Sequence, residues 1–204
     1  LLVCIDKLTC VKMAERIKEQ WELAIANLKK LLHIETEAFL KSTRGETTFV
    51  RELRAQIVWM EETQIHPVFS SEQNEVQDFL REGMDVLPYR KKIAEGIAGK
   101  SLEACFKSPE HPFRIAIVCA MWLTGFDVKS LATLYLDKPM QGHTLMQAIE
   151  RVNRVKKNKK NGMIIDYHGM LESLRKALSV YAQSAEGAAF DPLMDEDKAL
   201  AEYA

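Results

Sequence analysis

The chain has 204 residues and a formal net charge of −1, with 47% hydrophobic and 28% charged side chains. These values are those of an ordinary soluble globular protein of one domain, or of one domain with an appendage. No stretch reaches the roughly 20 apolar residues that a membrane span needs. Because the chain is almost neutral, any contact with nucleic acid must come from local basic patches and not from overall charge.

The N-terminal part predicts one strand followed by two helices. Residues 1–5 form a short apolar run, typical of a buried strand. This run lacks an initiator Met and the basic start of a signal peptide, so we expect a strand cut from a longer polypeptide. Apolar residues then recur at helical spacing and predict a helical insertion over about residues 11–63. They are Met13, Ile17, Trp21, Ile25, Leu28 and Leu32 in one helix, and Phe49, Leu53, Ile57 and Met60 in the next.

Four further strands are predicted at residues 65–69, 113–120, 131–136 and 163–167. The segment 113–120 is almost continuously apolar, as expected of a parallel strand covered on both faces. Cys119 ends this run, and we expect it to be a buried thiol. The four cysteines have no CxxC pair, which favours reduced thiols and a cytoplasmic location. Because helical segments separate the strands, the sequence predicts an α/β fold with a parallel sheet flanked by helices.

The segment that begins at Thr144 predicts an amphipathic helix with two distinct faces. We expect Thr144 to be its N-cap, with Gln147 three residues later as in a capping box. An apolar and a polar stripe share the spacing i, i+4, i+7 and differ by two residues, so they lie on opposite faces. The apolar stripe is Leu145, Ile149 and Val152, and the polar stripe is Gln147, Arg151 and Arg154.

Arg151 and Arg154 are therefore candidate phosphate ligands. Guanidinium groups match phosphate oxygens in a bidentate way and keep their charge. An arginine supplied from a second lobe can stabilise charge on a transferred phosphoryl group, which accelerates GTP hydrolysis by about 10³–10⁵ where it has been measured. The spacing alone leaves open that the arginines form a solvated face and that Gln147 only caps the helix.

The loop 121–127 directly follows the predicted strand at residues 113–120. In parallel α/β sheets, ligands bind outside the carboxyl ends of the strands. Gly125 lets the backbone approach a phosphate, Thr124 can donate to a phosphate oxygen, and Asp127 can accept from a sugar hydroxyl. The alternative is a structural turn in which Asp127 caps the next helix.

A serine pair and a basic turn are weaker candidates for nucleic-acid contacts. Ser70 and Ser71 stand at another predicted strand end, where they could contact a nucleic-acid backbone or cap the following helix. A basic turn after Arg154 could bind phosphate or only be solvated. It contains Lys156, Lys157, Lys159 and Lys160.

Residues 94–101 (AEGIAGKS) fit the loosest form of the phosphate-loop pattern. A real phosphate loop follows a buried strand and opens a helix, whereas the residues before this segment are basic and helix-like. We therefore expect no ATP binding there. The five histidines have no metal-ligand spacing, so we expect surface or capping residues and no metal site.

Combined in this order, the segments resemble the second motor lobe of type I restriction enzyme R subunits, a RecA-like lobe of superfamily 2 helicases. TGFD at 124–127 resembles helicase motif V, and QAIERVNR at 147–154 resembles motif VI; HPVFSSEQNEVQDF and LLVCIDKLTCVKMA resemble the preceding motifs. The resemblance covers about residues 1–185, which we expect to form this lobe, and residues 186–204 would be a tail that begins a truncated helical region. Glu150 departs from the Gly that many helicases have before the first motif VI arginine.

The resemblance implies one lobe of an ATP-dependent double-stranded DNA translocase. ATP and Mg would be bound mainly by a first motor lobe upstream, so the isolated 204 residues would hold no cofactor and be inactive. That lobe and a nuclease domain would share the chain, and methyltransferase and specificity subunits would be further partners, with no membrane. The resemblance assigns the γ-phosphate to Arg151 and Arg154, the ribose or a coupling role at the cleft to Asp127, and the DNA backbone to Thr124 and Gly125. We also expect Gln147 to contact the nucleotide, and Ser70 and Ser71 to contact DNA.

Three other functions remain open from the sequence. The same lobe could belong to another superfamily 2 repair or remodelling translocase. A small-molecule kinase could use residues 94–101 as its phosphate loop. A non-catalytic α/β interaction module would be favoured if the arginine stripe were buried in structural pairs.

Overall fold

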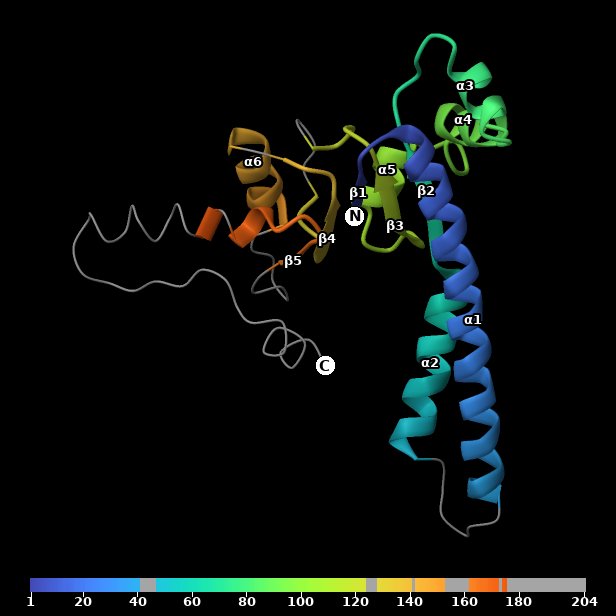
Figure 1. Cartoon of the computed structure of the whole chain (residues 1–204). Helices are drawn as coiled ribbons and strands as arrows, with labels where there is room; N and C mark the ends of the chain where they lie inside the picture. The colour runs from blue at the N-terminus through green and yellow to red at the C-terminus, as the bar shows by residue number, and fades with distance from the viewer. Residues whose placement is uncertain (41–46, 124–127, 141, 153–161, 173, 176–204) are drawn as a thin grey trace, which may run out of the picture. The chain divides into compact units, whose positions relative to one another are not determined.

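The computed structural model describes residues 1–40, 47–123, 128–140, 142–152, 162–172 and 174–175. Within these residues, five strands form an all-parallel sheet flanked by helices, consistent with a RecA-like lobe (Figure 1). The predicted fold class is therefore confirmed. The chain divides into two compact units, one made of Leu1–Ile5 with Ala120–Ala204 and the other of Asp6–Cys119.

The first unit contains β1 (Leu2–Cys4), β4 (Thr133–Asp137), α6 (Gly142–Val152) and β5 (Met163–Asp166). β4 is the middle strand of this unit. Its Tyr135 lies opposite Leu2 of β1, and its Leu136 lies opposite Asp166 of β5. Alternate residues of β4 are buried, namely Leu134 and Leu136. All three strands end at the same edge, as parallel strands must.

Helix α6 packs against β5. Its buried residues are Leu145, Ala148 and Val152, while Ile149 is half-buried. The predicted stripe is thus correct at both ends and shifted by one residue in the middle. The predicted N-cap is wrong, because α6 begins at Gly142 and Thr144 lies inside it.

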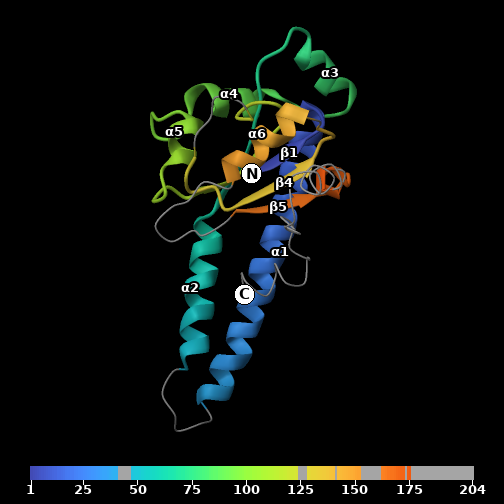
Figure 2. The same ribbon diagram turned by 90° about the vertical axis from the view of Figure 1, so that its left-hand side faces the viewer.

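The second unit begins with two helices that lie side by side as a hairpin, α1 (Lys7–Leu40) and α2 (Thr48–Glu62) (Figures 1 and 2). With 34 residues, α1 is about 50 Å long. The indole Nε1 of Trp21 donates to the carbonyl oxygen of Met60 at 2.9 Å, and Lys29 Nζ lies 2.6 Å from Glu61 Oε1. Both contacts join α1 to the last turn of α2.

The buried face of α2 is shifted from the predicted one at its N-terminal end. Leu53, Ile57 and Met60 are buried as expected, but Phe49 is 50% exposed and Val50 takes its place in the core. The cause is the helix start: the Thr47 hydroxyl accepts from the amide of Val50 at 3.3 Å and so fixes the first turn.

The rest of the second unit is β2 (Gln64–Val68), α3 (Glu75–Arg81), α4 (Leu87–Glu95), α5 (Leu102–Lys107) and β3 (Phe113–Val118). β2 and β3 are parallel neighbours, with Val68 opposite Val118. Helices α1 and α5 pack on these strands. The predicted boundary at residue 185 lies outside the described residues, so the division into lobe and tail stays a prediction.

Candidate nucleotide and nucleic-acid interface

The loop that precedes Thr124 has a strained backbone. Trp122 has a φ of +68° although its side chain is bulky and only 7% exposed, and Leu123 beside it is also buried. A left-handed conformation costs a residue with a side chain roughly 1–2 kcal/mol, so packing must hold it there. Strain of this kind is concentrated at functional sites, which makes this loop a candidate on structural grounds as well.

Arg151 is bound to this strained loop. From the last turn of α6, its Nε donates to the carbonyl oxygen of Leu123 at 2.6 Å. The side chain is half-buried. Among the hydrogen bonds between described residues, none comes from its terminal nitrogens Nη1 and Nη2, which carry four of the five N–H groups of a guanidinium. The arginine is therefore held in place through Nε, and no other described residue accepts a hydrogen bond from its terminal nitrogens.

The other predicted residues of this site differ in what the structure describes. Gln147 lies on α6 one turn before Arg151 and is half-buried. Thr124, Gly125, Asp127 and Arg154 lie outside the described residues, as do the four lysines of the basic turn. The structure thus brings Arg151 to the loop that leads into Thr124, and the further roles stay predictions.

The carboxyl ends of β4 and β5 carry a polar cluster that the sequence analysis missed. His168 Nε2 lies 3.5 Å from Asp137 Oδ1. The Asp166 carboxylate accepts from the amides of His168 and Leu171, at 2.9 and 2.8 Å. Both aspartates end an apolar strand, and that is the sequence signal that could have found them. Asp166 serves as a cap for the turn after β5.

The residues after β2 form a second strand-end loop, here called the serine loop (Phe69, Ser70 and Ser71). Ser70 and Ser71 are exposed. Arg90 of α4 holds the loop from behind: Nη1 donates to the Phe69 carbonyl at 2.9 Å and Nη2 to the Ser70 carbonyl at 2.6 Å. Its guanidinium also lies 4.5 Å from the centre of the Phe69 ring. No motif in the sequence points to Arg90.

Glu75 in turn fixes Arg90. The two side chains form a bidentate ion pair, in which Arg90 donates from Nε and Nη2 to the two carboxylate oxygens. Glu75 is only 7% exposed and belongs to the first turn of α3. The expectation that the serines could cap this helix is wrong, because the N-cap is Asn74, which makes no side-chain capping bond.

Residues 94–101 do not have the geometry of a phosphate loop, as the sequence analysis expected. They follow helix α4, not a strand. Ile97 and Lys100 exchange backbone hydrogen bonds of 2.9 and 3.0 Å, which closes a tight turn before α5. A Cβ on Gly96 would lie 1.9 Å from the Lys100 carbonyl oxygen, so the turn leaves no room there. These residues therefore cannot serve as the phosphate loop that the kinase hypothesis requires.

Two minor expectations also need correction. Cys119 is only half-buried, whereas Cys4, Cys10 and Cys105 are buried, and none of these four cysteines is in a disulfide. His66 is half-buried on β2, with its ring in an edge contact with Phe113 at 5.0 Å, and is not a capping residue. Burial lowers its pKa to about 4, with smaller contributions from Lys92, Lys18 and His111.

The described part of the chain offers neither a metal site nor a membrane span. No three His, Cys, Asp or Glu side chains in it come together as metal ligands would. None of its helices is both long and apolar enough to cross a bilayer.

The fold and the strand-end loop define the class of this chain as an α/β lobe of the RecA-like kind, with Arg151 of α6 fixed at a strand-end loop. Residues 39–169 match the family model described as type I restriction enzyme subunit R domain 3. This match spans more than half of the chain, and the chain belongs to that family.

Relatives with known names agree with this assignment. The chain is 52% identical over 103 residues to the type I restriction enzyme HindI endonuclease subunit of Haemophilus influenzae, which covers 49% of this chain and 10% of that protein. The SsaAORF53P subunit of Staphylococcus saprophyticus is 42% identical over 78 residues, or 38% of this chain and 8% of that protein. The SauCOLORF180P subunit of Staphylococcus aureus is 46% identical over 71 residues, which cover 34% of this chain and 8% of that protein. The chain thus spans about a tenth of the length of these endonuclease subunits.

Proposed function

We propose that this chain is part of the second motor lobe of an ATP-dependent double-stranded DNA translocase within a type I restriction endonuclease R subunit. The family match supports the R subunit. The observation that carries the motor role is the 2.6 Å hydrogen bond from Arg151 to Leu123, which joins the segment resembling motif VI to the residue directly before the segment resembling motif V. Family membership also makes another superfamily 2 translocase the weaker alternative.

In this proposal Arg151 and Arg154 act on the γ-phosphate of ATP, the substrate of the motor. The terminal nitrogens of Arg151 fit this role, since a guanidinium fork matches phosphate oxygens and no bond between described residues uses them. When bound, ATP with Mg²⁺ would supply the phosphoryl transfer that drives movement. Asp127 and Gln147 would contact the rest of the nucleotide, and the phosphate loop would belong to the first lobe.

The proposed DNA contacts come from two strand-end loops. Thr124 and Gly125 would contact the DNA backbone from one loop. The exposed Ser70 and Ser71 would contact it from the other loop. Contacts to phosphate and sugar position a protein on DNA without reading its sequence, as a translocase requires. Recognition of a DNA site would then fall to a specificity subunit.

The proposed partners are an upstream first lobe and a nuclease domain of the same R subunit, with methyltransferase and specificity subunits, in the cytoplasm. The 204 residues alone would then hydrolyse no ATP at a measurable rate. This follows because one lobe supplies cations but not the phosphate loop.

One observation favours a second candidate, a non-catalytic interaction module. Arg151 is half-buried and pairs with a backbone carbonyl, as an arginine with a purely structural role would. The two candidates differ in the importance of the unused terminal nitrogens. Only the motor needs them.

The test uses the whole R subunit with Arg151→Ala and Arg154→Ala, and Arg51→Ala as the control, because Arg51 is an exposed arginine of α2. We expect DNA-stimulated ATP hydrolysis to fall about 10³-fold in both variants, with only a modest loss of DNA affinity. The Arg51 variant should keep the wild-type rate. An unchanged turnover number in the Arg154 variant contradicts the motor role.

A further inference from the structure

Arg90 makes an unusual number of directed bonds for a surface-helix arginine. Four of its donor contacts are accounted for, two to Glu75 and one each to the carbonyl oxygens of Phe69 and Ser70. A guanidinium has five N–H groups, so Arg90 is almost saturated and has little capacity left for a ligand. Its role must be to hold the serine loop.

The peptide geometry gives this role a consequence. In a trans peptide the C=O and the following N–H point in opposite directions. Because Arg90 binds the carbonyls of residues 69 and 70, the amides of Ser70 and Ser71 point away from it. Among the hydrogen bonds between described residues, none involves these two amides or the two serine hydroxyls. Both serines are exposed, so four donors are available to a ligand.

We infer that the Arg90–Glu75 pair is a positioning device that presents the Ser70 and Ser71 amides as a receptor for one phosphate group of the DNA backbone. This inference rests on the proposed contact between the serine loop and DNA. Backbone N–H groups and serine hydroxyls are common phosphate ligands in protein–DNA complexes. Neither kind of donor reads a base, so the receptor fits a translocase that must accept every sequence.

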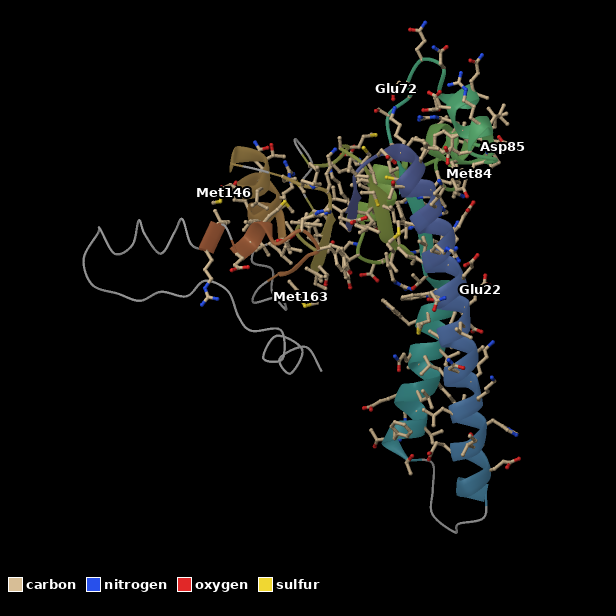
Figure 3. All side chains as sticks on the ribbon, viewed as in Figure 1. Glu22, Glu72, Met84, Asp85, Met146 and Met163 are labelled. Carbon is tan, nitrogen blue, oxygen red and sulfur yellow. The ribbon has the colours of Figure 1, made fainter. Side chains whose placement is uncertain are left out.

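A neighbouring carboxylate is neutralised, as a phosphate receptor requires. Glu72 follows the serine loop directly and is exposed (Figure 3). Lys7, at the start of α1, lies 2.7 Å from Glu72 Oε2 and 3.9 Å from Glu75 Oε2. The hydrogen bond and charge of Lys7 lower the pKa of Glu72. Lys7 and Arg90 thus balance the two glutamates, and hydrogen bonds rather than net charge would provide the affinity.

The test compares Arg90→Lys with Arg81→Lys in the whole R subunit. Arg81 is an exposed arginine of α3 that pairs with Asp78 on the surface and makes the matched control. A lysine cannot span two carbonyls and a carboxylate, so Arg90→Lys should raise the dissociation constant for a duplex about tenfold. Arg81→Lys should keep the wild-type dissociation constant.

The salt dependence separates positioning from direct contact. Each lost phosphate contact by a cation reduces the slope of log K against log salt by about 0.9. Arg90→Gln, which removes the cation, should lower the affinity and leave the slope unchanged. A slope reduced by about one in Arg90→Gln would mean that residue 90 itself binds phosphate, which overturns the inference.

The amide is tested by Ser71→Pro, with Ser71→Ala as a control that keeps the N–H. We expect Ser71→Pro to weaken DNA binding about as much as Arg90→Lys, and the double variant to lose little more, because both remove the same contact. If Ser71→Pro lowers the DNA affinity and Arg90→Lys does not, the positioning role of Arg90 is wrong but the serine contact with DNA is kept. If neither Ser71→Pro nor a Ser70→Ala/Ser71→Ala variant changes DNA binding, the proposed serine contact itself is wrong.

Two further measurements complete the test. If Ser71→Pro weakens ATP binding and not DNA binding, the receptor takes a nucleotide phosphate and the DNA assignment fails. Hydrogen exchange of wild-type subunit needs no variant: the amides of residues 70 and 71 should exchange fast without DNA and more slowly with a duplex. Slow exchange of these two amides without DNA would show that they do not point outward. This result does not depend on whether Arg90→Lys folds stably.

Discussion

Arg151 and Arg90 each hold a strand-end loop through a backbone carbonyl, but they differ in the donors that remain. Arg151 uses Nε for Leu123 and has both terminal nitrogens left among the described contacts. Arg90 makes four hydrogen bonds, two to the buried Glu75 and one to each of two backbone carbonyls. The number of donors left over, and not exposure alone, separates an arginine that can act on a ligand from one that shapes a loop.

The largest expected effect tests the first half of this comparison. Arg151→Lys keeps a positive charge but loses the fork, so hydrolysis of ATP by the whole subunit should fall about 10²–10³-fold. The free energy of unfolding of the chain should change by less than about 1 kcal/mol, because one hydrogen bond to a carbonyl is lost. Steady-state ATPase assays and urea titrations give both values; a large loss of stability with normal turnover would assign Arg151 a structural role.

The second prediction concerns Glu75→Ala. Removing this carboxylate leaves Arg90 partly buried without its partner, which should lower the free energy of unfolding by about 3 kcal/mol. Asp78→Ala removes the partner of Arg81 in an exposed pair and should cost less than about 1 kcal/mol. Similar urea midpoints for the two variants would contradict the structural role of the Arg90–Glu75 pair.

The third prediction is a pH dependence from His66, whose pKa burial lowers from 6.5 to about 4. The unfolded chain then binds the proton more readily, so stability is lost as pH falls from about 6.5 towards 4. Because the ring is partly exposed, we expect a loss of only about 1 kcal/mol between pH 7 and 5. His66→Gln should lose correspondingly less over this range in urea titrations, and parallel curves would refute the assignment.

The smallest expected effect concerns Lys7 and Glu72. Lys7→Gln leaves the Glu72 charge beside the serine loop, so DNA affinity should fall about two- to threefold at low salt and less at high salt. Adding Glu72→Gln should restore the affinity. Lys12→Gln serves as the control, because Lys12 lies on the same helix as Lys7 and forms an exposed ion pair with Glu82. Duplex titrations that show equal losses for both lysines would disprove a specific role of Lys7.

The sequence predicted the fold well because the strands are apolar runs and the helices have regular stripes. Errors arose where one local bond decides a register. The Thr47 cap puts Val50 rather than Phe49 in the core, and α6 starts at Gly142, two residues before the expected cap. Periodicity identifies a face of a helix but does not fix its first residue.

The candidate site was predictable only where a motif carries it. Arg151 stands in a recognisable segment, and the structure brings it to the expected loop. Arg90 stands in no motif, and its importance depends on Glu75 and on two carbonyls about 20 residues away in the sequence. Asp137 and His168 likewise meet only because β4 and β5 are neighbours. Contacts of this kind come from tertiary structure, and spacing does not reveal them.

The most direct test of the central claim is a single-turnover measurement on whole R subunit loaded with ATP and then mixed with duplex DNA. For Arg151→Ala we predict that ATP and DNA still bind but that bound ATP is hydrolysed at least about 100-fold more slowly than in the wild type. Hydrolysis of the bound ATP at the wild-type rate would show that this guanidinium takes no part in the chemistry.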